Sequence, residues 1–223
     1  MFSDAEKPYA VYPWLGCERA TCVHCRTEDT YNLCQARGRA SKKFVDGETI
    51  YGGYASHSVV PHWKYLLDFE GALPRGLGCV YMCSGLTAFG ALKKVQRHPG
   101  IVNSQDVLIL GLGGLGFQGL GFSVPMLGGP PMVADIDEEK LSRAVEMVPG
   151  TRAFNSREKT AIQAVREASF DGTGLGAVID FVGNEATANF AEKVLRKGGK
   201  YVLCGLFGGM QHKPLIMLPL MAR

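Results

Sequence analysis

The sequence predicts an α/β protein whose larger part is a doubly wound parallel sheet, preceded by a smaller part rich in short strands and turns. From residue 106 onward, short apolar runs alternate with amphipathic helical segments, which is typical of a parallel sheet covered by helices on both faces. Nearer the amino terminus, four cysteines lie within residues 17–34. The sequence changes character near residue 85, which predicts two domains, residues 1–84 and residues 85–223.

The predicted elements follow from apolar periodicity and from helix-breaking residues. In the first part, the alternation over Gly52–Pro61 predicts a strand. In the second part we expect four strands, at Val107–Leu110, Met132–Ile136, Ala177–Val182 and Tyr201–Leu206. We expect helices at Leu86–Gln96, Glu138–Met147, Lys159–Ala168 and Glu185–Leu195, the last stopped by Lys197, Gly198 and Gly199. The helix that follows Gly113 contains two further glycines and Pro125, so we expect it to be short or kinked near Pro125.

Composition excludes several classes of function. The chain has 223 residues, of which 46% are hydrophobic and 20% charged, and a net charge of +3 is too small to indicate a nucleic acid or an anionic membrane as partner. No apolar stretch is long enough to cross a bilayer, and the first residues do not form a secretory signal. Seven cysteines without such a signal indicate reduced thiols or metal ligands, and therefore a cytoplasmic protein.

A glycine-rich turn follows the apolar run Val107–Leu110 and carries the pattern G-x-G-x-x-G at Gly111, Gly113 and Gly116. The first glycine permits a tight turn, the second lets the backbone approach a pyrophosphate, and the third lets a helix pack closely on the strand. The amino terminus of that helix offers free N–H groups to phosphates. This order predicts a dinucleotide-binding (Rossmann) unit.

An acidic residue, Asp135, ends the next apolar run at the position where a carboxylate can accept both hydroxyls of an adenosine ribose. The same charge would repel a 2′-phosphate, so NAD is favoured over NADP as cofactor. The alternative is a glycine-rich turn in an ordinary α/β protein, with Asp135 acting as the N-cap of a helix.

The cysteine cluster has the spacing C-x4-C-x2-C-x8-C, formed by Cys17, Cys22, Cys25 and Cys34. Four thiolates on a turn-rich loop can surround one Zn²⁺ tetrahedrally, and such a site stabilises a loop that has little hydrophobic core. A pair of free thiols or a redox pair is the alternative, and His24 or Glu18 could replace one sulfur. The arginines of this loop are interspersed with acids, unlike those of a nucleic-acid-binding zinc ribbon.

Three stretches together resemble the zinc-dependent medium-chain alcohol dehydrogenase family: the cysteine cluster with the preceding YPWLGC, CSGLTAFGALKK at Cys83–Lys94, and ILGLGGLG with VADID. The resemblance implies a partial GroES-like catalytic domain before the Rossmann domain, and a structural zinc on the four cysteines. It also implies that Cys83 is a catalytic-zinc ligand and that Thr87 lies beside the nicotinamide. It further implies cofactor contacts at Gly114, Leu115, Lys140, Val182, Gly183, Gly205, Leu206 and Phe207, in addition to Gly111, Gly113, Gly116 and Asp135.

The sequence departs from that family at the catalytic metal. A C-x-[ST]-D stretch and a G-H-E motif, which supply two further zinc ligands in the family, do not occur. We therefore expect the chain to correspond to the middle of such an enzyme, truncated at both ends. Other candidate ligands are weak, since His57 and His62 resemble surface residues of a strand and Cys79 resembles a small buried hydrophobic residue.

Two functional hypotheses remain open at this stage. The first is an NAD(H)-dependent oxidoreductase that interconverts a small-molecule alcohol and an aldehyde or ketone. The second is a non-catalytic NAD-binding module that retains a structural zinc. A zinc-containing nucleic-acid-binding protein fits the low charge less well. The apolar stretch Pro214–Pro219 predicts association, and hence a homo-oligomer.

Overall fold

The structure is a computed structural model. It describes residues 8–12, 14, 16–26, 30–36, 60, 62–69 and 72–205. The chain divides into two compact units, Met1–Cys79 and Val80–Arg223. The domain boundary predicted after residue 84 lies within the π-helical turn η4 (Tyr81–Gly85), close to the start of the second unit. Residues 1–84 and 85–223 as separate domains stay a prediction.

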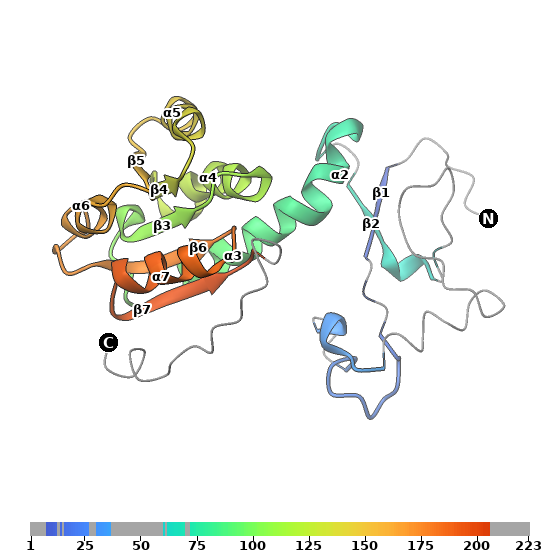
Figure 1. The fold of residues 1–223 in the computed structure, drawn as a ribbon. Helices are drawn as coiled ribbons and strands as arrows, with labels where there is room; N and C mark the ends of the chain where they lie inside the picture. Colours follow the sequence, from blue (N-terminus) through green and yellow to red (C-terminus); the bar gives the residue numbers. More distant parts are fainter. Residues whose placement is uncertain are drawn as a thin grey trace. The chain divides into compact units, whose positions relative to one another are not determined.

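The second unit contains the predicted parallel sheet (Figure 1). All four strand pairings are parallel, in the order β5-β4-β3-β6-β7. Because β4 lies on one side of β3 and β6 on the other, the strand order reverses at β3, and the carboxyl ends of these strands border the crevice where such sheets bind ligands. The strands are β3 (Val107–Leu110), β4 (Met132–Asp135), β5 (Arg152–Asn155), β6 (Leu175–Asp180) and β7 (Leu195–Leu203).

Helices cover both faces of this sheet, which confirms the doubly wound arrangement. In β3, Val107 and Ile109 belong to the apolar cluster of one face, and Leu108 and Leu110 to the cluster of the other face. Every residue of β3 is buried, as expected for a central parallel strand. The first cluster contains residues of α3 (Leu86–Gln96), α4 (Gly114–Leu127) and α5 (Glu138–Met147), and the second contains residues of α6 (Ala161–Glu167) and α7 (Glu185–Val194).

Two elements, α4 and β7, differ most from the prediction. Helix α4 is not short, because it continues through Pro125 to Leu127 and ends at Gly128 in the left-handed conformation. Its glycines allow close packing that outweighs their poor helix propensity: a Cβ on Gly119 would lie 3.0 Å from the ring of Phe181. Strand β7 begins at Leu195, and the predicted breaker Gly198 lies inside it at a register irregularity.

Strand β5 was not predicted from the sequence. Its four residues, RAFN, are at most partly buried and show neither an apolar run nor a clear alternation. The strand exists because β4 supplies a parallel partner for its backbone, with Asp135 paired to Asn155. The residues that follow β5 lie at the carboxyl-end edge of the sheet, close to Asp135.

The first unit is described in shorter pieces. Strand β1 (Tyr9–Val11) pairs antiparallel with β2 (Leu66–Asp68), and the segment predicted as a strand at Gly52–Pro61 lies almost entirely outside the described residues. None of the described helices is both long enough and apolar enough to span a membrane. The other short elements near this part of the chain are η1 (Tyr31–Leu33), η2 (Trp63–Tyr65), η3 (Arg75–Leu77) and α2 (Gly78–Val80). The second unit contains one more, η5 (Ser104–Asp106), just before β3.

Candidate zinc and dinucleotide sites

The first unit brings the four predicted sulfur ligands together. The Sγ atoms of Cys17, Cys22, Cys25 and Cys34 all lie within 4.8 Å of one another. The Cys17–Cys25 pair is 3.7 Å apart and the Cys22–Cys34 pair 3.9 Å apart. In a tetrahedral site with Zn–S bonds of about 2.3 Å, sulfurs are separated by about 3.8 Å. The four thiols are therefore spaced to hold one zinc ion.

Local turns place these sulfurs. The N–H groups of Cys25 and Arg26 both donate to the carbonyl of Cys22, which closes a tight turn, and Cys34 follows the short helix η1. Gly16 has no room for a side chain, since a Cβ there would lie 2.7 Å from the Tyr31 ring. The loop is thus shaped around the sulfurs by backbone hydrogen bonds and close packing.

The surroundings of the loop lower the thiol pKa at two of the four positions, Cys22 and Cys34. The backbone N–H of Cys25 lowers the pKa of Cys22 to about 7. Burial raises the pKa of Cys34, but N–H groups of Cys17 and Ala36 outweigh it and lower the pKa overall. Burial raises the pKa of Cys25 to about 11. A cation among the sulfurs would stabilise the remaining thiolates, which is what a zinc site requires.

Glu18, considered as a replacement ligand, has another role. Its carboxylate accepts a hydrogen bond from the Tyr65 hydroxyl at 3.1 Å and pairs with Lys64 at 2.6 Å, and these contacts lower its pKa. Neither Glu18 nor His24 belongs to the sulfur group. Glu18 instead links the cysteine loop to η2, which precedes β2.

In the second unit, the glycine turn has the geometry that its motif predicts. Gly111 lies in the left-handed region at φ +93°, and a Cβ on Gly116 would lie 1.9 Å from the carbonyl oxygen of Gly111. A Cβ on Gly113 or Gly114 would meet nothing within 4 Å. The first and third glycines are therefore required by the fold, whereas the open space at the second fits the approach of a pyrophosphate to the start of α4.

Asp135 ends β4 and is only 8% exposed. One carboxylate oxygen accepts the N–H of Leu112 at 2.5 Å, and the other accepts those of Ile136 and Asp137 at 2.8 and 3.1 Å. A carboxylate offers about four acceptor positions, so a ribose hydroxyl can still donate to it. Asp135 is not the cap of α5, because Asp137 caps that helix. The N-cap alternative is therefore wrong.

A hollow of about 330 Å³ lies at the carboxyl ends of the strands and joins three predicted cofactor residues, Gly111, Asp135 and Val182. It also contains Arg157, which the sequence analysis missed because β5 was not predicted. The guanidinium of Arg157 has no hydrogen bond or ion pair with the described residues. The other lining residues are Leu110, Ala134, Ile136, Ser156, Asn184, Ala186, Thr187 and Phe190.

Some predicted cofactor residues lie away from this hollow. Lys140 pairs with Asp137 at 3.6 Å, and Leu115 packs against the apolar core. Gly183 and Gly205 face each other, since a Cβ on Gly183 would lie 2.0 Å from the Gly205 carbonyl oxygen. Leu206 and Phe207 are outside the described residues.

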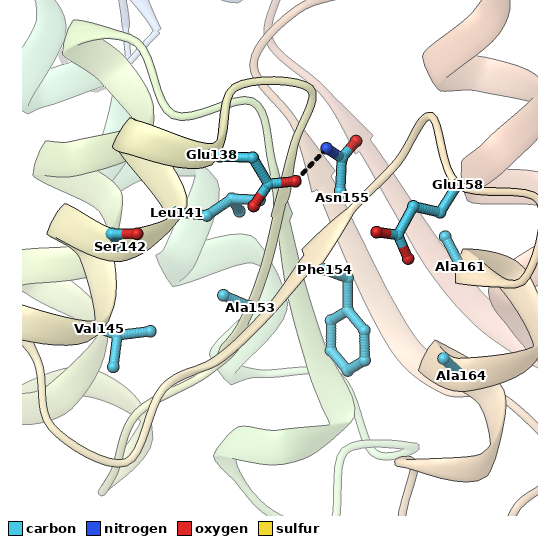
Figure 2. A pocket seen from close by; sticks show the side chains of 10 residues that line it. All are labelled: Glu138, Leu141, Ser142, Val145, Ala153, Phe154, Asn155, Glu158, Ala161 and Ala164. Atoms are coloured by element: carbon cyan, nitrogen blue, oxygen red, sulfur yellow. Dashed lines mark hydrogen bonds between the residues drawn. The ribbon is translucent and has the colours of Figure 1, made fainter.

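A second hollow, of about 290 Å³, lies beside the edge strand β5, between α5 and α6 (Figure 2). The amide of Asn155 donates to Glu138 at its rim. This hollow contains none of the predicted site residues. The dinucleotide motif therefore points to the hollow at Asp135.

Cys83 lies exposed on the π-helical turn η4, a type of distortion that is frequent at functional sites. Thr87, one turn later, donates its hydroxyl to the Cys83 carbonyl at 2.8 Å. In the described part of the chain, Cys83 belongs to no group of three or more metal-ligating side chains. Cys79 is exposed, so its interpretation as a buried hydrophobic residue is wrong, and His62 is exposed and caps η2.

Comparison with known proteins indicates the family of the chain. The family model described as zinc-binding dehydrogenase matches residues 119–223. The NAD-dependent alcohol dehydrogenases of Sulfurisphaera tokodaii and Saccharolobus solfataricus are 32% and 31% identical over 212 residues, 94% of this chain. The chain belongs to the zinc-type medium-chain alcohol dehydrogenase family. It spans 56% of each of these two relatives, about half their length.

Solved structures of dehydrogenases share the fold. The D-arabinose dehydrogenase from Sulfolobus solfataricus superposes with a TM-score of 0.74 at 23% identity, over 95% of this chain and 61% of that one. The alcohol dehydrogenase from Aeropyrum pernix gives 0.74 at 22% identity, over 96% and 59%. At these identities the likeness extends to the fold alone.

Proposed function

We propose that this chain functions as an NAD(H)-dependent oxidoreductase that interconverts an alcohol and an aldehyde or ketone. The observation that carries the proposal is the hollow that joins the glycine turn at Gly111 with the carboxylate of Asp135. The relatives named NAD-dependent alcohol dehydrogenase support it, and since the chain spans about half their length, its own activity is a proposal.

The roles of this chain's residues in binding follow from their surroundings. The open space at Gly113 and Gly114 would admit the pyrophosphate to the first turn of α4, whose N–H groups favour an anion. Asp135 would accept a ribose hydroxyl and repel a 2′-phosphate, which favours NAD over NADP. When bound, NAD⁺ supplies the acceptor for the hydride that leaves the alcohol carbon.

The zinc proposed for the four cysteines has a structural role. Four protein ligands close a tetrahedral shell, which leaves no open position for an alcohol oxygen. Cys17, Cys22, Cys25 and Cys34 would hold the ion and stabilise a loop with few buried apolar residues.

The described residues do not complete a catalytic zinc site at Cys83. A catalytic zinc usually has three protein ligands and one open position, and Cys83 is the one described residue we propose for that site. We therefore derive no step through a second zinc. An NAD-binding module that does not turn over alcohols is the second candidate, which the experiment below separates from the enzyme.

Calorimetric titration with NADH tests the binding proposal. The wild-type chain should bind, and Asp135→Ala should weaken binding about ten-fold or more, because it removes a ribose acceptor and the anchor of Leu112. Absence of binding by the wild type would refute the function. NADH formation with a panel of alcohols, compared with Cys83→Ala, then separates the candidates: turnover lost in Cys83→Ala supports the enzyme, and binding without turnover supports the module.

We also propose a cellular location and an oligomeric state. All seven cysteines are free, which supports a reducing, cytoplasmic location. We further propose a homo-oligomer, on the basis of the apolar stretch Pro214–Pro219, which lies outside the described residues. Light scattering that gives a monomer mass at high concentration would refute it.

A further inference from the structure

A fully buried acid, Asp180, stands at the carboxyl end of β6 beside the nucleotide hollow. One of its carboxylate oxygens accepts the N–H groups of Val182 and Gly183 at 2.8 and 3.0 Å. The other accepts the hydroxyl of Tyr201 at 2.7 Å. A buried carboxylate is tolerated only when its acceptor positions are used in this way, so the three donors and the acid form one hydrogen-bonded cluster.

Tyr201 reaches Asp180 from the neighbouring strand. It lies on β7, paired in register with Val178 of β6, and its ring is partly buried against the second apolar cluster. Burial raises the pKa of the Tyr201 phenol above its usual range, and the adjacent Asp180 raises it further. The hydroxyl therefore stays protonated, and able to donate to Asp180, at neutral pH.

This hydrogen-bonded cluster shapes the turns at the ends of β6 and β7. Gly183 is held at φ +75°, in contact with Gly205 at the end of β7. The carbonyl of Asp180 accepts the N–H groups of Cys204 and Gly205 at 2.8 and 3.1 Å. Asp180 thus fixes the turns after β6 and β7 at once, one with its side chain and the other with its backbone.

One of these turns forms a wall of the hollow. Val182 lines the hollow together with Asp135, and its Cγ2 atom fills the space where a Cβ on Gly111 would lie, 2.3 Å away. A shift of Val182 would therefore alter both the hollow and the support behind the glycine turn.

We propose that Asp180 and Tyr201 are a positioning pair that holds the Val182–Gly183 wall in the shape that binds the adenosine half of a dinucleotide. Neither residue lines the hollow, and both act through the turn. The inference rests on the proposed NAD(H) function and adds to it two residues that the dinucleotide motif does not contain.

The test is the affinity of Tyr201→Phe, measured on the full chain with NADH and with ADP-ribose, which lacks the nicotinamide. Removing the hydroxyl leaves the ring in place and takes one donor from Asp180. We expect both ligands to bind about ten-fold more weakly, as is typical when a hydrogen bond to a charged group no longer supports a site. Unchanged affinity for both ligands would overturn the proposal.

A matched control separates positioning from general loss of stability. Ser169 is buried before the amino end of β6; its hydroxyl donates to Arg166 at 2.6 Å and accepts the N–H of Gly174 at 3.2 Å. Ser169→Ala should lower the melting temperature as Tyr201→Phe does, with NADH affinity unchanged. An equal loss of affinity in both variants would show that Tyr201 acts only through stability and would overturn the proposal.

A measurement on the wild type keeps the proposal testable if Tyr201→Phe does not fold. The amides of Val182 and Gly183 should be protected from hydrogen exchange in the free protein, because the wall is formed before the ligand binds. Rapid exchange of both amides without ligand would overturn the proposal. A wild-type chain that does not bind NADH would instead refute the proposed function, and this role with it.

Discussion

A buried ion pair at the amino end of the sheet gives the sharpest stability prediction. The guanidinium of Arg196, at the start of β7, contacts both carboxylate oxygens of Asp106 at 3.0 and 3.2 Å. The Asp106 side chain is fully buried and that of Arg196 is 16% exposed. Arg196 also donates to the carbonyls of Gly100 and Gly174, so it joins three segments that meet before β3 and β6.

The substitution Arg196→Met keeps most of the aliphatic stem and removes the charge. In this variant Asp106 would keep one hydrogen bond, from the backbone N–H of Val102 to its Oδ2 atom at 2.9 Å. Leaving a buried charge without its partner costs about 3–5 kcal/mol, against a typical total stability of about 5–15 kcal/mol. For a unit of this size the melting temperature should fall by roughly 6–20 °C.

The assay can follow each unit separately. Both tryptophans, Trp14 and Trp63, lie in the first unit, whereas helices α3 to α7 lie in the second. In urea titrations of Arg196→Met, the circular dichroism midpoint should fall and the tryptophan fluorescence midpoint should stay constant. A loss of less than about 1 kcal/mol by circular dichroism would refute the reasoning, because it would mean that water or another donor replaces the guanidinium. The double variant Asp106→Leu/Arg196→Met should recover part of the loss.

Three further predictions concern the two sites. Gly116→Ala should destabilise the second unit by about 1–3 kcal/mol and abolish NADH binding, because its Cβ would overlap the Gly111 carbonyl at 1.9 Å; Gly90→Ala, in open space on α3, should be neutral or stabilising. Metal analysis should find one zinc per chain, and a chelator should change the tryptophan fluorescence while the helical signal is retained; zinc that persists in Cys34→Ser would contradict the four-sulfur site. Arg157→Glu should weaken NADH binding about ten-fold, by placing a second carboxylate in the hollow of Asp135, and this loss should shrink as salt is added; an affinity equal to wild type would exclude Arg157 from the cofactor site.

The sequence predicted those elements whose patterns lie within one short segment of the chain. Strand β3 and helix α5 have the predicted bounds, because a continuous apolar run and an amphipathic period with an N-cap are local properties. Strand β5 was missed because it depends on its pairing with β4. The Asn184–Thr187 capping box could have been read from its spacing, and it explains why α7 starts next to the hollow.

The candidate sites divide in the same way. The grouping of the four cysteines and the glycine turn were predictable, because their residues lie close together in the sequence and their chemistry depends on spacing. Contacts between distant segments were not: Arg196 and Asp106 are far apart in sequence and meet only in the folded sheet. Arg157 and the Asp180–Tyr201 pair belong to this second class, since each depends on which strands are neighbours.

The acid of the dinucleotide motif has a second task that the motif alone does not reveal. Asp135 accepts the N–H of Leu112, inside the glycine turn, before any ribose is present. Asp180 fixes the opposite wall of the hollow in the same way. Two buried carboxylates, at the ends of the strands β4 and β6 that flank β3, therefore shape the turns that the cofactor would contact. Each is compensated by N–H donors, and Asp180 also by the Tyr201 hydroxyl, rather than by a cation. It follows that removing Asp135 would not simply change the cofactor preference from NAD to NADP. The substitution would remove the charge that repels a 2′-phosphate, but also the hydrogen bond to Leu112 that holds the glycine turn in place.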